Sequence, residues 1–161
     1  MADKDSSWFE KKHFIEDVGL LMEQSGQPRM AGRIVGWLLI CDPPHQAPSE
    51  MAEVLAASKA SISTMTRLLV QTGLIERVAM PGHRRDYYRL KEGAWSEVMR
   101  QQMEEIIAGR QLADRGLELM QGKSPDLKQR LKQVRDFYVF FEQEYPVLLE
   151  RWDKERKRAA R

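Results

Sequence analysis

Apolar residues along the chain recur mostly at the three- and four-residue spacing of helices, and prolines and glycines interrupt this pattern. Ser49 and Ser58 are suited to cap the starts of two short helices, and Gly73 is suited to end the second of them. Asp42–Pro48 contains three prolines and is predicted to be a loop. The pattern as a whole predicts helices over residues 7–25, 28–41, 49–55, 59–72, 95–120 and 127–152.

The spacing of apolar residues changes to two after Gly73, within residues 74–80 and 87–91. This alternation predicts two strands joined by a turn that starts at Pro81-Gly82 and has a basic tip. Two short helices followed by such a hairpin give the order of a winged helix-turn-helix. The expected fold class is therefore mainly α, a winged helix-turn-helix with a two-stranded β-wing.

The last helix has the most regular pattern in the chain, with apolar residues spaced alternately by four and three. This is a heptad seam, which calls for a partner helix. We predict that it forms a dimer interface, although packing within the monomer stays open as an alternative. Pro146 interrupts the helix and is expected to kink it near Tyr145. The predicted interface residues are Leu127, Leu131, Val134, Tyr138, Phe141, Tyr145, Leu148 and Trp152.

Composition is typical of one globular domain of 161 residues, and no apolar run is long enough to span a membrane. The N-terminus lacks the basic and apolar regions of a secretory signal, and a single cysteine is typical of a reducing compartment. We therefore expect a cytoplasmic protein. The overall charge is only +2, but residues 56–91 carry seven basic side chains against Glu76 and Asp86. This basic stretch indicates a nucleic-acid partner.

The second short helix presents a polar side to solvent if Ile62, Leu68 and Leu69 face the core. Short hydroxyls and cations on that side suit the major groove of DNA, and arginines at the hairpin tip suit phosphate or the minor groove. The basic C-terminal segment, residues 151–161, is interpreted as a disordered solubilising end, and contact with flanking phosphates stays open as an alternative. The predicted DNA-binding residues are Lys59, Ser61, Ser63, Thr64, Arg67, His83, Arg84 and Arg85.

Other chemistry is weakly indicated. The three histidines and Cys41 have no metal-ligand spacing, and no phosphate loop or nucleophile motif is present in the sequence, so neither a metal, a cofactor nor enzymatic activity is expected. Cys41 is interpreted as a small buried residue. Four aromatic residues suit a cage for an organic cation, but helical spacing favours the core for them. They are Trp8, Trp37, Trp95 and Tyr138.

Four segments resemble the MarR-type regulators, and more closely their GbsR-like branch: residues 49–55 (SEMAEVL), 59–69 (KASISTMTRLL), 73–77 (GLIER) and 81–88 (PGHRRDYY), with support from 14–19 and 28–33. The resemblance implies one MarR-like domain over residues 1–161, with N- and C-terminal dimerisation helices (1–27 and 92–161) around a winged helix-turn-helix core (28–91). It also implies a small-molecule effector, of which quaternary ammonium compounds such as choline are one class, at a site that the sequence does not locate.

We therefore expect a homodimeric transcriptional regulator that binds a pseudopalindromic site on double-stranded DNA and acts as a repressor. The alternative is a winged-helix module that binds another protein, whose recognition face would be apolar or acidic rather than basic. The operator, the effector, the regulated genes and the direction of regulation are not fixed by the sequence.

Overall fold

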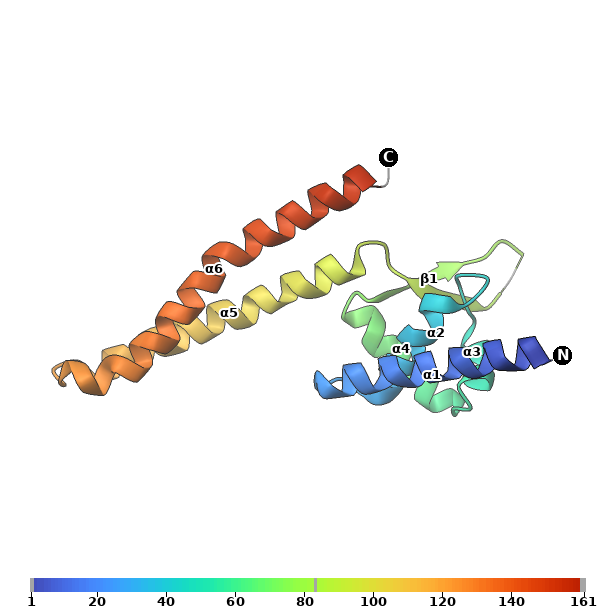
Figure 1. The fold of residues 1–161 in the computed structure, drawn as a ribbon, viewed down its shortest axis with the longest axis horizontal. Helices are drawn as coiled ribbons and strands as arrows, with labels where there is room; N and C mark the ends of the chain where they lie inside the picture. The colour runs from blue at the N-terminus through green and yellow to red at the C-terminus, as the bar shows by residue number, and fades with distance from the viewer. Residues whose placement is uncertain (1, 83, 160–161) are drawn as a thin grey trace. The chain divides into compact units, whose positions relative to one another are not determined.

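The computed structural model describes residues 2–82 and 84–159, and the chain divides into two compact units, Met1–Ala94 and Trp95–Arg161 (Figure 1). The elements are α1 (Ala2–Gln24), α2 (Arg29–Ile40), α3 (Pro48–Val54), α4 (Lys59–Gln71), β1 (Ile75–Ala79), β2 (Asp86–Leu90), α5 (Ala94–Leu119) and α6 (Pro125–Ala159). The fold is mainly helical with one antiparallel pair of strands, and the expected fold class is confirmed.

The core of the first unit is built on α2, which is buried along most of its length. Gly32 and Gly36 lie four residues apart on the side of α2 that faces α1. A Cβ atom at Gly32 would lie 2.8 Å from the Cα of Gly19, and one at Gly36 would lie 3.1 Å from the Cα of Ile15. The two helices therefore approach closely because no side chain separates them. A dimerisation role for α1 stays a prediction.

The start of α3 differs from the expectation. The sequence predicts Pro48 in the loop and Ser49 as the N-cap, but the helix begins at Pro48 and Ser49 is its second residue. Proline is well tolerated there, because an N–H at the first helical position has no acceptor within the helix. The side chain of Glu50 supplies the capping interaction instead, since its Oε2 accepts a hydrogen bond of 2.8 Å from the N–H of Ala47.

The caps of α4 confirm the prediction for this helix. Ser58 precedes the helix with extended backbone, and its Oγ accepts a hydrogen bond of 3.1 Å from the N–H of Ser61. Gly73 follows the C-cap with a φ of 72°, a conformation that glycine adopts without strain. The start and the end of the second short helix are thus fixed by residues that the sequence singled out.

The hairpin that forms the wing pairs Ile75 with Leu90 and Ala79 with Asp86 at its two ends. The first strand is one residue shorter than predicted at each end, and the second has the predicted length but lies one residue earlier, from Asp86 to Leu90. Gln46, in the predicted loop, forms an isolated bridge with Tyr88, with N–H to O distances of 2.9 Å in both directions. The loop before α3 is therefore attached to the free edge of β2.

The second unit is a hairpin of α5 and α6. The ring of Tyr138 occupies the space above Gly109, where a Cβ would lie 2.4 Å from the ring, and Leu131 packs over Gly116. Charged residues flank these contacts: Arg110 pairs with Glu142 and Asp114, and Arg135 also pairs with Asp114. The helix α6 continues through Pro146 to Ala159, so the basic segment is helical over residues 151–159 and not the disordered end that the sequence predicts. A kink near Tyr145 stays a prediction.

Candidate nucleic-acid interface

The two sides of α4 differ in burial and in chemistry. Ile62, Thr66 and Leu69 are buried, and the hydroxyl of Thr66 donates a hydrogen bond of 2.8 Å to the carbonyl of Ile62. The opposite side is solvent-exposed over Lys59, Ser63, Thr64 and Arg67, whereas the predicted contact Ser61 is half-buried. An exposed helix face with hydroxyls between two cations offers hydrogen-bond donors to base edges and to phosphates.

The cations on this face have no partner within the described residues, because neither Lys59 nor Arg67 takes part in a side-chain hydrogen bond or an ion pair there. Paired cations lie instead on the strands of the wing. Arg77 pairs with Asp86 at 3.3 Å, and Arg89 pairs with Glu76 at 2.7 Å. The net positive charge of this stretch therefore comes from α4, from the tip of the hairpin and from Lys91, which follows β2.

The two arginines at the tip are adjacent in sequence but have different surroundings. Arg84 is exposed and forms no hydrogen bond or ion pair with the described residues. Arg85 lies 3.5 Å from Oε1 of Glu50, and its Nε donates a hydrogen bond of 3.0 Å to the hydroxyl of Tyr87. Neither partner of Arg85 is predicted by the sequence pattern. The third predicted tip residue, His83, lies outside the described residues.

The predicted dimer interface on α6 is divided between two environments. Contacts with α5 of the same chain are made by Leu131, Tyr138 and Tyr145. These three residues therefore agree with the alternative that α6 packs within its own monomer. Phe141 is half-buried and lies against the rings of Phe137 and Phe140. The exposed members of the predicted interface are Leu127, Val134, Leu148 and Trp152, and further exposed apolar residues on α6 are Phe137, Phe140 and Val147.

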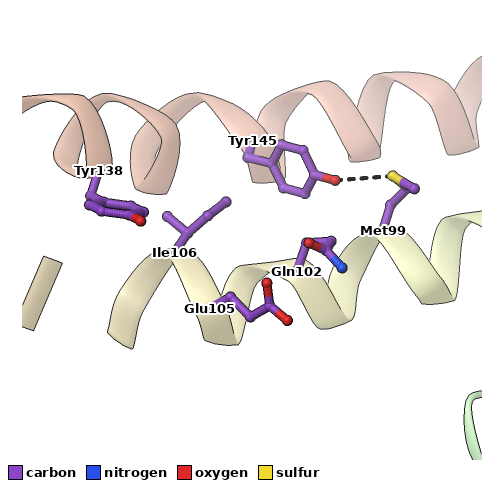
Figure 2. Close-up of a pocket in the computed structure, with 6 residues that line it drawn as sticks. All are labelled: Met99, Gln102, Glu105, Ile106, Tyr138 and Tyr145. Atoms are coloured by element: carbon purple, nitrogen blue, oxygen red, sulfur yellow. Dashed lines mark hydrogen bonds between the residues drawn. The ribbon is translucent and has the colours of Figure 1, made fainter. Parts of the chain in front are cut away.

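A groove of about 360 Å³ lies between α5 and α6 (Figure 2). Ile106 lies between the rings of Tyr138 and Tyr145, and the hydroxyl of Tyr145 donates a hydrogen bond of 3.2 Å to the sulfur of Met99. Gln102 and Glu105 complete the lining. Of the four aromatic residues considered for a cation cage, only Tyr138 is among these lining residues, so this groove does not assemble that cage.

Of the aromatic residues expected in the core, Trp37 is buried, whereas Trp8 and Trp95 are exposed, so the expectation was wrong for these two. Trp8 and Trp37 meet edge to face at 6.0 Å, and the indole N–H of Trp37 donates a hydrogen bond of 3.2 Å to Gln46. Burial raises the pKa of the Cys41 thiol, which keeps it protonated and unreactive near neutral pH. Within the described residues, no group of three or more metal-binding side chains is assembled, and no helix is long and apolar enough to span a membrane.

Comparisons with known proteins agree with this geometry. Residues 93–155 match the family described as MmpR5-like MarR family transcriptional regulator. The HTH-type transcriptional regulator MmpR5 of Mycobacterium tuberculosis is 40% identical over 129 residues, which cover 80% of this chain and 78% of that protein. The chain belongs to the MarR family of transcriptional regulators, in its MmpR5-like group.

The chain is also similar to two further transcriptional regulators. A crystal structure of a transcriptional regulator is 37% identical with a TM-score of 0.74, and the match covers 90% of this chain and 99% of that one. The HTH-type transcriptional repressor OpcR of Bacillus subtilis is 28% identical over 82 residues, which cover 51% of this chain and 44% of that protein. The protein is thus a DNA-binding transcriptional regulator, and its family is one of regulators rather than enzymes.

Proposed function

We propose that this MarR-family regulator binds double-stranded DNA as a homodimer, with α4 in the major groove and the wing against the adjacent backbone or minor groove. The exposed polar side of α4 carries the proposal, because Lys59 and Arg67 are left without partners among the described residues while the opposite side of the same helix is buried. In helix-turn-helix proteins the second helix is the one that reads base edges.

The contacts divide into two roles. Lys59, Ser63, Thr64 and Arg67 are proposed to supply specificity and part of the affinity, with Ser61 contributing at the start of the helix. Arg84 is proposed to bind phosphate or the minor groove, since its guanidinium is exposed and unpaired among the described residues. His83 and Arg85, the other two predicted DNA contacts of the wing, are neighbours of Arg84 in the sequence of the hairpin tip.

The exposed apolar residues of α6 support the homodimer. A run of exposed phenylalanine, leucine and tryptophan side chains along one helix is uncommon on a monomer and typical of an interface. We retain the proposed division into dimerisation helices at 1–27 and 92–161 and a DNA-binding core at 28–91. A two-fold dimer favours a pseudopalindromic operator with half-sites about 10–10.5 base pairs apart, or a multiple of this.

The proposal has three further parts: repression, control by an effector, and placement in the GbsR-like branch. A relative of 28% identity is itself named a repressor, which favours repression for this chain. The motifs at 49–55 and 81–88 favour the GbsR-like branch. A regulator of chromosomal genes would act in the cytoplasm and needs no catalytic activity or cofactor.

The competing function is a winged-helix module that binds a protein partner. Such a face is expected to be apolar or acidic, whereas the exposed side of α4 carries two cations and two hydroxyls. Gel shifts with the DNA upstream of the protein's own gene separate the two functions. Specific retardation of that DNA over a scrambled fragment supports the proposal, and equal binding to both fragments contradicts it.

The Arg84→Ala variant tests the wing. We expect weaker binding to all DNA sequences, together with a loss of about one from the slope of log K against log salt for each phosphate contact removed, hence about two per dimer. Anisotropy titrations between about 50 and 200 mM salt measure this slope. Arg77→Ala is the matched control, because it removes an equal charge from the same hairpin at a side chain that is already paired with Asp86. An unchanged slope for Arg84→Ala would exclude a phosphate contact by the wing.

A further inference from the structure

One pair of side chains, Glu50 and Arg85, joins the tip of the hairpin to the first turn of α3. We propose that Glu50 and Arg85 form a latch, which holds the wing against the start of α3 so that Arg84 is presented to DNA. In this role Arg85 is a positioning residue and not itself a phosphate contact. The inference rests on the proposed DNA-binding function and adds to it a division of labour between two adjacent arginines.

Glu50 uses both of its carboxylate oxygens. Oε2 accepts the hydrogen bond from the N–H of Ala47, which fixes the side chain at the first turn of α3. Oε1 then faces the guanidinium of Arg85 at 3.5 Å. Because one oxygen is held by the backbone, the other is presented to the wing in a defined direction.

Arg85 also contacts a residue of the wing, Tyr87. Its Nε donates to the hydroxyl of Tyr87 at 3.0 Å, and its guanidinium carbon lies 5.4 Å from the centre of that ring. Tyr87 is buried, and its ring meets His45 edge to face at 5.4 Å. The guanidinium therefore joins a buried residue of β2 to the first turn of α3.

The other ion pairs of the wing cannot do this. Arg77 with Asp86 and Arg89 with Glu76 join one strand to the other, so they stabilise the hairpin without fixing where it lies. A two-stranded hairpin is marginally stable alone and depends on contacts with the rest of the domain. The bridge between Gln46 and Tyr88 holds the middle of β2, and within the described residues the pair of Glu50 and Arg85 is the ion pair that links the hairpin to a helix.

Charge also argues against a phosphate contact by Arg85. A phosphate that approached its guanidinium would approach the carboxylate of Glu50 as well, and the two charges of the pair cancel at a distance. Arg84 has no such neighbour among the described residues. Among the described residues of the tip, Arg84 is therefore the cation that is offered to DNA.

The Glu50→Gln variant distinguishes a latch from simple electrostatics because the two predict opposite signs. Glutamine keeps an oxygen for the N–H of Ala47 but loses the charge that holds Arg85. If Arg85 were a DNA contact partly neutralised by Glu50, removal of the carboxylate would tighten DNA binding. For the latch we expect binding about three- to ten-fold weaker, since an exposed ion pair contributes up to about five-fold and a dimer has two of them.

Glu53→Gln is the matched control, because it removes an equal charge from the exposed side of the same helix at a side chain without an ion pair in the described residues. We expect its operator affinity to equal that of the wild type or to exceed it slightly. Thermal unfolding of both variants shows whether α3 is intact. If Glu50→Gln is unstable, Arg85→Gln tests the latch from the other partner, where the salt slope of binding rather than the sign of the affinity change separates the two roles.

Arg85→Gln and the double variant complete the experiment. For the latch, Arg85→Gln weakens binding without changing the salt slope, and the double variant is no weaker than either single one. Hydrogen exchange in the free protein should be faster at the amides of the wing in both single variants. Tighter or equal binding by Glu50→Gln, or a fall in slope for Arg85→Gln as large as that for Arg84→Ala, overturns the latch. A wild type that does not bind duplex DNA instead overturns the proposed function.

Discussion

Ser49 and Ser58 lie at the starts of neighbouring helices, but their side chains do different things. Ser58 caps α4 through the N–H of Ser61, whereas Ser49 is an exposed residue within α3. We predict that Ser58→Ala lowers the free energy of unfolding by about 1 kcal/mol, the usual cost of a lost N-cap. Ser49→Ala should change it by less than about 0.5 kcal/mol.

Urea denaturation at a fixed protomer concentration measures both values, because the stability of a dimer depends on concentration. Equal losses in the two variants would contradict the assignment of the caps. An additional loss of operator affinity in Ser58→Ala is expected, since Lys59 and Ser61 belong to the turn that Ser58 fixes.

For single residues, the sequence predicts which side chains are exposed better than it predicts which side chains they contact. The exposed cations of α4 follow from helical periodicity alone, because burial of Ile62 and Leu69 determines which side is left to solvent. Arg84 and Arg85 are equivalent in sequence, however. Their difference arises from Glu50, which lies 35 residues earlier and meets Arg85 only once the chain has folded.

Among the helices, α5 and α6 are joined by a cluster of charges around Asp114. Hydrogen bonds from Arg135 and Arg110 hold the pKa of Asp114 below its ordinary value of 3.8, against the opposing effect of desolvation. A lowered pKa in the folded state means that the stabilisation is complete above the ordinary value and is lost as the pH falls through the lowered one.

We therefore predict that Asp114→Asn is less stable than the wild type at pH 7 and that its stability depends less on pH in acid. Denaturation between about pH 5 and pH 2 checks this. Glu104→Gln, at an exposed position on α5 without an ion pair among the described residues, serves as the control and should keep the acid slope of the wild type. If the slopes of Asp114→Asn and the wild type coincide, the cluster does not stabilise the helix pair.

The heptad pattern of α6 illustrates what periodicity leaves undetermined. A regular spacing of four and three predicts that one side of a helix packs against another helix, but it does not identify which helix that is. Tyr138 and Tyr145 turn toward α5, whereas Leu148 and Trp152 stay exposed. The pattern therefore combines a contact within the chain and an open surface, which only the three-dimensional packing separates.

For the whole molecule, the open surface of α6 makes the assembly testable. We predict that Leu148→Glu converts a wild-type dimer into a monomer, because a buried unpaired charge at an interface costs several kcal/mol. Gln143→Glu adds the same charge at an exposed position on another side of the helix and should leave the dimer intact. Sedimentation velocity at micromolar concentration distinguishes the two outcomes.

The loss of the dimer should also lower operator affinity, since each subunit would then bind one half-site without the help of the other. A wild-type protein that sediments as a monomer would remove the basis for a pseudopalindromic operator. A dimeric Leu148→Glu variant would show instead that the subunits meet through other residues.

The contact between Gly109 and Tyr138 constrains how this hairpin can evolve. Any side chain at position 109 would overlap the ring, so glycine is retained there for as long as position 138 is aromatic. The two positions must therefore change together: a descendant with alanine or larger at 109 requires a smaller residue at 138. Because the ring also lines the groove beside Ile106, such a paired exchange would widen that groove.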